Sequence, residues 1–538
     1  MAMAFKPPVR RHLLCQSSRA CRSHFSEPVR LWPSSFSQCR SISRTAAAFS
    51  ENASGGRTRT SLSMTVRELL DTTSDIPERA VIHGWVPSIR RMKNVSFATF
   101  TDGSTSRVVQ VVLSPELAKG LTIGAAAKIT GSWQTSLKEN AQQRELVATQ
   151  VDILGESDPG TYPLQKKSHT FEYLRSIPHL RSRSGVARSL LLLRSAALSH
   201  LSDFFHAKGF LQTHPPVLTS SDCEGAGEVF SLARRGDTGA NGQEEEFFGD
   251  KTFLTVSAQL HLEALAMGAS RVWCLAPTFR AEKSDTARHL SEFYMLEAEV
   301  AFVDELGQIM DLAEDMMRDL VSTVANDANV RADLLGRRRG EGDTSLDPAA
   351  LEERWEDVTE KPWQRLTYTD AVDTLLKAVE GGKEFKFPVK WGLNLQSEHE
   401  KYLAEVVGDG APVFVTDFPA ELKPFYMLPN DELGNNTIDH DNSERRTVSC
   451  FDLLVPQVGE IVGGSMREHR YEKLEKAMED MSEEARQQLG WYLELRKWGS
   501  VKHGGFGVGF DRLLGFIAGV ENIRETVAFP RWHGRCLC

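Results

Sequence analysis

Gly504-Gly505-Phe506-Gly507-Val508-Gly509-Phe510-Asp511-Arg512 is the stretch that says most about the fold. Its first half is rich in glycine and reads as a strand or turn. From Phe510 onward apolar residues recur at helical spacing, which predicts an amphipathic helix with Arg512 in its first turn. Close backbone approach and a fixed guanidinium suit a nucleotide phosphate. A glycine-rich loop is a weak signal alone, and no GxxxxGK[ST] supports P-loop chemistry.

A hairpin with a charged loop is predicted upstream. Its two sides are Pro277-Thr278-Phe279-Arg280-Ala281-Glu282 and Arg288-His289-Leu290-Ser291-Glu292-Phe293. Apolar strand-like runs at 272–275 and 295–300 flank this segment. The planar guanidinium of Arg280 could neutralise a phosphate, and Phe293 could stack on a base. The alternative is a surface cluster of salt bridges, which would contribute little to stability.

Two further segments carry candidate site residues. Asp452 and Glu460 are hard-oxygen ligands about one strand apart, and Mg²⁺ is typically held by one or two carboxylates plus substrate phosphates. A glycine-rich turn with surface acids is the alternative. Upstream, a leucine-rich helical stretch at 190–205 runs into 209–219, where two prolines interrupt an extended segment. Taken alone, that segment indicates only the end of a helix and a strand.

The rest of the chain divides into two regions of different pattern. Residues 66–155 contain about five short strand-like runs, which suggests a small β-barrel such as the oligonucleotide-binding OB-fold. Residues 186–538 mix strands and helices without βαβ alternation, which favours an antiparallel α+β domain over a Rossmann sheet. A helix is predicted over 304–325, and the highly charged stretch 331–361 is expected to be a solvated insertion.

Charge is distributed unevenly along the 538 residues. The net charge is −10, but residues 1–60 carry ten basic and two acidic side chains, a net +8 that leaves −18 on the remainder. This basic segment, rich in Ser and Ala, is typical of an organellar transit peptide; a basic tail that binds nucleic acid is the alternative. No apolar run approaches the roughly 20 residues that span a bilayer. The eight Cys form no CxxC pair and no zinc-finger spacing.

In order, the segments around 209–219, 277–293 and 504–512 resemble motifs 1, 2 and 3 of the class II aminoacyl-tRNA synthetases, with 452–467 between motifs 2 and 3. The barrel region resembles the anticodon-binding domain of the class IIb branch, which includes the aspartyl, asparaginyl and lysyl enzymes. The resemblance implies a five-stranded OB-fold barrel and a catalytic domain built on an antiparallel sheet flanked by helices. The expected boundaries are a transit peptide at 1–62, the barrel at 63–157, a linker at 158–185 and the catalytic domain at 186–538.

Within this branch, three segments resemble asparaginyl-tRNA synthetases: 222–228, 423–427 and 491–496. The aspartyl enzymes typically have a Lys facing the substrate carboxylate, three residues after Ser-Pro-Gln. Here Leu262 takes that position, after Ser257-Ala258-Gln259. A buried aspartate side chain would need a cation beside it, so the absence of that lysine favours a substrate with a neutral amide. Arg467 can donate to the amide oxygen, while the acceptor of the amide NH₂ remains unassigned from the sequence.

The resemblance implies that asparagine is joined to tRNA(Asn) through an adenylate formed from ATP, with no side-chain nucleophile. Arg280 and Arg512 are the implied catalytic residues. The implied ATP-binding residues are Arg280, Glu282, Arg288, His289, Phe293, Glu460, Gly509 and Arg512, and the Mg²⁺ ligands are Asp452 and Glu460. Glu224 and Gln259 would hold the substrate ammonium group and Arg467 its side chain. Arg90, Phe97 and Gln110 match anticodon-reading positions, and Pro216 matches a homodimer interface.

Three alternatives stay open on the sequence alone. An aspartyl enzyme would have the same motifs with a different side-chain pocket. A catalytically silent paralogue would lack the motif arginines, whereas Arg280 and Arg512 are both present. Phe97, taken without its motif context, reads equally well as part of the barrel core. The expected compartment is a mitochondrion, a plastid or both.

Overall fold

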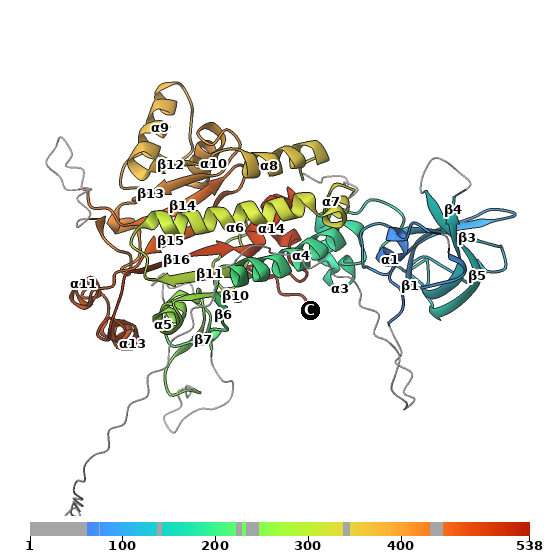
Figure 1. Ribbon diagram of the computed structural model, residues 1–538, viewed down its shortest axis with the longest axis horizontal. Helices are drawn as coiled ribbons and strands as arrows, with labels where there is room; N and C mark the ends of the chain where they lie inside the picture. The colour runs from blue at the N-terminus through green and yellow to red at the C-terminus, as the bar shows by residue number, and fades with distance from the viewer. Residues whose placement is uncertain are drawn as a thin grey trace, which may run out of the picture. The chain divides into compact units, whose positions relative to one another are not determined.

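The computed structural model describes residues 62–74, 76–136, 143–221, 229–232, 247–336, 345–430 and 445–538 (Figure 1). The transit-like segment up to residue 61 lies outside the described residues, and so does Glu224. Among the described helices, none has both the length and the apolar character needed to cross a bilayer.

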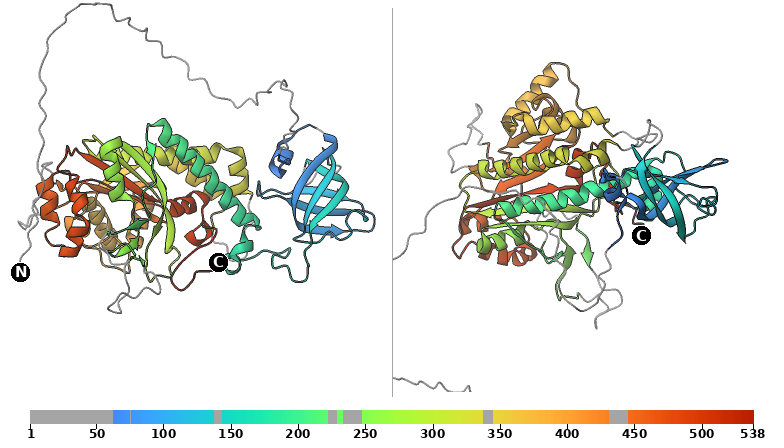
Figure 2. Two further views of the ribbon diagram at one scale, coloured as in Figure 1. Left: turned by 90° about the horizontal axis from the view of Figure 1, so that it is seen from below. Right: turned by 45° about the vertical axis from the view of Figure 1, so that its right-hand side comes forward.

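The N-terminal strands close into a five-stranded barrel in the order β1-β2-β3-β5-β4, drawn in blue to cyan in Figure 2. Helix α1 (Val66–Asp71) precedes strands β1 (Ile76–Arg91), β2 (Ser96–Thr101), β3 (Val109–Leu113), β4 (Ala126–Thr135) and β5 (Arg144–Gly155). Alternate residues of β4 are buried, as period-2 side-chain geometry requires, so that Ile129 and Trp133 enter the core. Parallel pairing of β3 with β5 completes the ring. The predicted five-stranded barrel is therefore confirmed.

The segment predicted as a linker contains two short helices, α2 (Phe171–Ser176) and α3 (Pro178–Arg181). Arg181 is 2% exposed, and its Nη2 lies 2.9 Å from an Oε atom of Glu525. Thr170 caps α2 by accepting a hydrogen bond from the Tyr173 amide at 3.2 Å. The segment is thus fastened to the C-terminal part of the chain by a buried ion pair.

The larger region is built on an eight-stranded sheet in the order β12-β13-β14-β15-β16-β11-β10-β6. The strands are β6 (Leu211–Gln212), β10 (Arg271–Phe279), β11 (Glu292–Ala301), β12 (Gln364–Thr367), β13 (Val413–Thr416), β14 (Cys450–Val455), β15 (Gly459–Met466) and β16 (His503–Gly509). The six central strands are antiparallel, as predicted. Only the short edge strands β6 and β12 pair in parallel with their neighbours.

Two long helices, α4 (Gly185–Ala207) and α6 (Leu306–Asn326), lie across one face of this sheet (Figure 1). The buried residues of α6 include Ile309, Met310, Met316, Met317 and Leu320, which form its predicted apolar face. Helix α14 (Phe510–Ala518) follows directly from β16, as the glycine-rich stretch predicts. The helix that the sequence assigns to a nucleotide phosphate therefore begins at the end of β16, one of the central strands of the sheet.

The charged stretch 331–361 departs from the prediction. Helices α7 (Ala328–Leu335) and α8 (Pro348–Glu360) lie on either side of 337–344, which is outside the described residues. Leu351 and Trp355 belong to the main hydrophobic core and are 1% and 2% exposed. The prediction of a solvated insertion is therefore wrong for the described parts, because apolar residues one turn apart give a strongly charged helix a buried face.

The remaining elements are short or lie near the ends of the sheet. Strands β7 (Leu218–Thr219), β8 (Ser231–Leu232) and β9 (Thr252–Leu254) form a small second sheet in the order β7-β9-β8. The other helices are α5 (Gln259–Ala269), α9 (Tyr368–Glu380), α10 (Ser397–Val406), α11 (Tyr471–Ala477), α12 (Glu483–Gln488), α13 (Gly490–Glu494), and the 3₁₀ turns η1 (Ala420–Leu422) and η3 (Ile523–Glu525).

Candidate active site

A cavity of about 380 Å³ opens over the central strands β11, β15 and β16. Its lining contains every small-molecule site residue predicted from the sequence except Glu224, which lies outside the described residues. These residues are Gln259, Arg280, Glu282, Arg288, His289, Phe293, Asp452, Glu460, Arg467, Gly509 and Arg512. Segments spread over more than 250 residues of sequence therefore converge on one pocket.

The predicted charged hairpin forms one wall of the cavity. Strands β10 and β11 pair antiparallel, and Phe279 lies opposite Glu292 at the open end. The Arg280 amide donates to the Ser291 carbonyl at 3.0 Å, which fixes the arginine where the hairpin opens. The Arg280 guanidinium lies 5.7 Å from the centre of the Phe293 ring. A cation and an aromatic face are thus presented together, as a nucleotide phosphate and base require.

His289 sits in the same loop, between polar partners. Its Nε2 lies 3.3 Å from a Glu282 oxygen, and its Nδ1 lies 2.8 Å from the Ser284 hydroxyl. Burial lowers the pKa of His289, and the nearby cations, including Arg288, lower it further against the opposing effect of Glu282. The imidazole therefore favours its neutral form.

The glycine-rich stretch also contributes to the cavity lining. Arg512 Nη1 donates to the Glu460 carbonyl at 2.6 Å, so the guanidinium is held beside the acidic residues. The Asp511 carboxylate accepts from the Tyr294 amide at 2.8 Å and pairs with Arg194 at 2.5 Å. The start of α14 is thereby tied to β11 and α4. This arrangement orients Arg512 before any ligand arrives.

Two carboxylates meet above β15. A Cβ added at Gly463 would lie 3.2 Å from an oxygen of Glu460 and 3.7 Å from an oxygen of Asp452, so the two acids converge over this glycine. Lys423 Nζ contacts both Asp452 oxygens, at 2.9 and 2.8 Å. Burial raises the pKa of Asp452 to about 6 despite this lysine. Each Asp452 oxygen keeps a second lone pair, so the acid pair fits a hard cation such as Mg²⁺.

Glu400 is a third acid at this place that sequence reasoning missed. It lies on α10, and its carboxylate accepts from the Glu460 amide at 3.3 Å. Burial, Glu460 and Asp452 together raise its pKa to about 7. Its position in the sequence, about 50 residues before the other acids and inside an ordinary helix, gave no sign of the contact.

The far end of the cavity is a different chemical environment. Arg467 is 3% exposed, and its Nη2 donates to Glu299 at 3.0 Å. Glu297 accepts from the Ala258 amide at 2.9 Å and also from the Ser257 hydroxyl. Leu262 lines the cavity here, at the position where a lysine would supply a second cation. The end of the cavity thus offers a buried donor next to buried acceptors.

Comparisons with known proteins show the family of the chain. The family model for tRNA synthetases of class II (D, K and N) matches residues 172–533, and the model of the OB-fold nucleic acid binding domain matches residues 80–154. The mitochondrial asparagine–tRNA ligase of Schizosaccharomyces pombe is 43% identical over 84% of this chain and 94% of its own length. The asparagine–tRNA ligase of Picosynechococcus is 40% identical over 87% of this chain and 98% of its own length.

The chain belongs to the asparagine–tRNA ligase family. Solved structures of such ligases share its fold. The asparaginyl-tRNA synthetase of Pyrococcus horikoshii, complexed with asparaginyl-adenylate, superposes with a TM-score of 0.71 at 27% identity and covers 88% of this chain and 99% of its own. The asparaginyl-tRNA synthetase of Entamoeba histolytica gives a TM-score of 0.69 at 26% identity, covering 85% and 96% of the two chains. The protein described here is thus a class II enzyme with an OB-fold domain, as the two family models indicate.

The predicted anticodon-reading residues lie together on the barrel of this ligase. Arg90 on β1 is paired with Phe97 on β2, and Gln110 on β3 is paired with Thr99 on β2. Phe97 is half-buried between the fully buried Ser96 and Ala98, so its ring lies on the outer face of the sheet and not in the barrel core. Gln110 donates to Glu145 at 2.9 Å.

Pro216, which the sequence matched to a dimer interface, lies at the surface, and three large apolar side chains are also exposed. Pro216, between β6 and β7, is exposed. Leu198 on α4, Leu211 on β6 and Leu218 on β7 are also exposed, at 44%, 57% and 43%.

Glu297 and Glu299 are further functional candidates that sequence reasoning missed. The run 295–300 reads as an apolar strand, and in β11 both acids are nonetheless buried, at 4% and 1% exposure. The available signal was their spacing, because acids two residues apart in a strand share one face. Two acids on one face of an otherwise apolar strand require buried partners.

Proposed function

We propose that the protein joins asparagine to tRNA(Asn) in two steps. In the first, a carboxylate oxygen of asparagine attacks the α-phosphorus of ATP, and pyrophosphate leaves as asparaginyl-adenylate forms. In the second, the 3′-hydroxyl of the terminal adenosine of the tRNA attacks the activated carbonyl, and AMP leaves. The observation that carries the proposal is that one cavity is lined by Arg280 and Arg512 and also by Arg467 and Glu299.

The cavity walls support a role in positioning and charge stabilisation. We assign contact with the α-phosphate to Arg280, and contact with the γ-phosphate to Arg512 and His289. We assign stacking on adenine to Phe293, and contact with the adenine amino group or the tRNA end to Glu282. Arg288 and Gly509 complete the ATP side of the cavity. These groups act on charge that develops in the reaction, which is how preorganised sites accelerate phosphoryl transfer.

We assign the Mg²⁺ ligands to Asp452 and Glu460. The support is their convergence over Gly463, next to the Arg512 guanidinium. Bound there, the ion would neutralise phosphate charge. Lys423 already offsets the charge of Asp452, so it keeps that carboxylate in place before ATP binds.

The amide of asparagine fits the Arg467–Glu299 pair. The guanidinium is a donor and the neighbouring carboxylate an acceptor, and a carboxamide needs one of each side by side. An aspartate side chain would instead place its negative charge against Glu299. Gln259 lies at the same end, where it can bind the substrate ammonium group, and Glu224 is proposed for the same task from the sequence alone.

On the barrel, we assign anticodon recognition to Arg90, Phe97 and Gln110. The outward face of Phe97 supports stacking on a base, which contributes about 1–3 kcal/mol per base in single-strand binding. Arg90 is exposed beside it for a phosphate, and Gln110 supplies an amide for a base edge.

We further propose that the protein forms a homodimer and that it works in an organelle. The exposed apolar side chains of Leu198, Leu211 and Leu218 and the exposed Pro216 support the dimer, and sedimentation of the purified protein tests it. The basic N-terminal segment and the mitochondrial S. pombe relative support mitochondrial or plastid targeting. Fusion of residues 1–62 to a fluorescent protein tests the targeting, and a diffuse cytosolic signal would contradict it.

The active-site assignment is tested by Arg280→Ala. We expect asparagine-dependent ATP–pyrophosphate exchange to fall by at least about 100-fold, the loss typical for removing one preorganised transition-state donor. Arg365→Ala is the matched control, because Arg365 lies on edge strand β12 and forms exposed ion pairs with Asp311 and Glu314. Exchange by the control should match the unmodified protein. Exchange retained in Arg280→Ala would refute the assigned role.

A further inference from the structure

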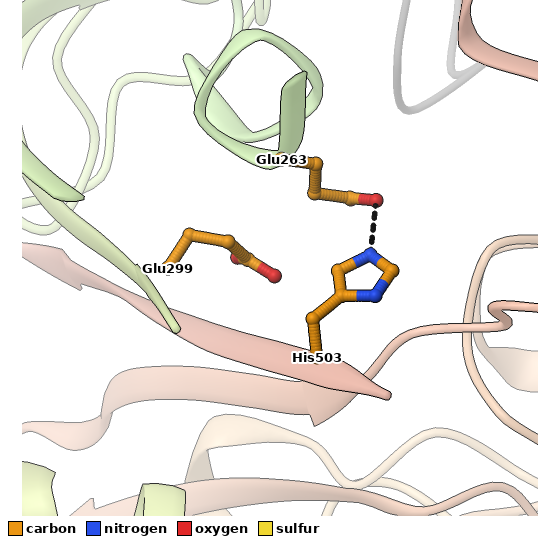
Figure 3. A group of neighbouring side chains, drawn as sticks. All are labelled: Glu263, Glu299 and His503. Atoms are coloured by element: carbon orange, nitrogen blue, oxygen red, sulfur yellow. Dashed lines mark hydrogen bonds and ion pairs between the residues drawn. The ribbon is translucent and has the colours of Figure 1, made fainter. Parts of the chain in front are cut away.

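A buried polar network lies behind the amide end of the cavity. Figure 3 shows Glu263 from α5, Glu299 from β11 and His503 from β16 pointing toward one another. Their ligand atoms lie within 4.8 Å of one another, close enough in principle to hold a metal ion. All three are almost completely buried, at 0%, 1% and 0% exposure.

The contacts argue against a metal ion at this place. One Glu263 oxygen accepts from Arg496 Nη2 at 2.6 Å and from the Tyr492 hydroxyl at 2.7 Å, and lies 3.1 Å from His503 Nε2. Glu299 is bound by Arg467. Two carboxylates therefore already face two guanidinium groups, and a divalent cation would bring uncompensated positive charge into a buried site.

Glu263 connects this network to the cavity. Its other oxygen accepts from Gln259 Nε2 at 3.1 Å and lies 3.8 Å from Arg467 Nε. Gln259 and Arg467 both line the cavity, and Glu263 lies behind them. Burial opposes ionisation of Glu263, but Arg496, His503 and Arg467 together outweigh it and hold its pKa well below the usual range. Glu263 is therefore a fixed negative charge beneath the pocket.

The backbone is shaped to admit this arrangement. A Cβ at Gly505 would lie 2.1 Å from the Glu299 carboxylate and 2.2 Å from the Ala298 carbonyl. Only glycine therefore leaves room for Glu299 to turn toward Arg467. As a result Arg467 lies between two carboxylates, with Glu299 at 3.0 Å and Glu263 at 3.8 Å.

We propose that Glu263 is a specificity-determining positioning residue, whose charge makes the pocket reject a substrate carboxylate. This inference rests on the proposed function. With one acid near it, Arg467 would still attract an aspartate side chain; with two, its charge is offset before a substrate binds. A neutral carboxamide can share the hydrogen bonds of Arg467 and Glu299, whereas a carboxylate adds a further negative charge beside Glu299 and Glu297. Buried like charges repel strongly because the protein interior screens them poorly.

The test is Glu263→Gln in the full-length protein. Glutamine keeps the shape and can accept from Tyr492 and Arg496, but it removes the charge. We expect the ratio of kcat/KM for aspartate to that for asparagine, measured by pyrophosphate exchange, to rise by at least about tenfold, the factor that 1.4 kcal/mol represents. An unchanged ratio, with exchange lowered equally for both amino acids, would reduce Glu263 to a structural role and overturn the proposal.

Two controls separate charge from packing. Tyr492→Phe removes a hydrogen bond to the same oxygen and leaves the charge intact, so the ratio should stay as it is even if exchange falls. Thermal melting shows whether each variant is folded. If Glu263→Gln does not fold, Arg496→Gln carries the test: it removes a positive charge and must lower the ratio, and an unchanged ratio there overturns the proposal. A preference of the unmodified protein for aspartate would overturn the proposed function itself, and this inference with it.

Discussion

At the scale of single residues, the sequence predicted the site residues that lie in recognisable motifs. It did not predict the residues that only the fold brings to the site. Arg280, Arg512 and Arg467 lie in segments that the sequence analysis singled out, and all three line the cavity. Glu297, Glu299 and Glu400 are ordinary acids in a strand or helix. Only the tertiary structure shows that Glu297 and Glu299 are buried in the cavity lining and that half-buried Glu400 contacts Glu460. Lys423 was noted for its segment, yet its ion pair with Asp452 needed the folded chain.

The half-buried acid Glu400 gives a prediction about pH. Its folded pKa of about 7 lies above its ordinary value of 4.5, so the folded protein binds this proton more tightly. Stability contributed by the protonated form is fully present below pH 4.5 and is lost as the pH rises through 7. We expect Glu400→Gln, without ATP or Mg²⁺, to be more stable than the unmodified protein at pH 8, by up to roughly 3 kcal/mol.

Urea denaturation at pH 5 and pH 8 checks this prediction. The gain from Glu400→Gln should shrink strongly at pH 5, where the native carboxyl is already protonated. Glu405→Gln, an exposed position near the end of the same helix, is the control and should change stability little at either pH. An equal gain from Glu400→Gln at both pH values would contradict a titrating group.

At the scale of elements, the periodicity of apolar residues predicted those helices and strands that depend on local sequence. The barrel strands, helix α6 and the strand-to-helix passage at Phe510 follow from alternating or helical spacing of apolar residues. The parallel edge strands β6 and β12 have two and four residues, and their direction comes from tertiary pairing. In α8 the charges dominated the composition and concealed the buried face at Leu351 and Trp355.

Helix α8 can be tested as part of the core. Trp355 is 2% exposed, and its Nε1 donates to the Ile517 carbonyl of α14 at 2.8 Å. Trp355→Ala should lower the free energy of unfolding by about 3–5 kcal/mol, the usual cost of removing a large buried aromatic side chain. Glu356→Ala, at the exposed neighbouring position, should change it by less than about 0.5 kcal/mol. Equal small effects in urea unfolding would mean that α8 is a solvated insertion after all.

At the scale of the whole molecule, net charge alone gives a misleading picture. The −10 of the chain combines a basic N-terminal segment of +8 with a remainder of −18. Such an acidic body would not be expected to bind nucleic acid, although the OB-fold and synthetase families both do. Binding must therefore rest on local basic sites, such as Arg90, Arg91 and Lys93 on the barrel, and it should weaken as salt concentration rises.

A further prediction follows if the barrel recognises the tRNA and the cavity activates the amino acid. Phe97 lies on the barrel and does not line the cavity, so Phe97→Ala should leave pyrophosphate exchange unchanged. Loss of base stacking should weaken kcat/KM for tRNA charging by about 5- to 150-fold, corresponding to 1–3 kcal/mol. Leu154→Ala, at a 60% exposed position on β5, is the control. Unimpaired charging by Phe97→Ala would remove Phe97 from the anticodon site.

The central claim is that this cavity activates asparagine and rejects aspartate. It is tested most directly by ATP–pyrophosphate exchange with the purified, unmodified protein and each amino acid in turn. The geometry of Arg467, Glu299 and Leu262 predicts exchange that depends on asparagine, with aspartate far slower. Faster exchange with aspartate, or no exchange with either amino acid, would contradict the account.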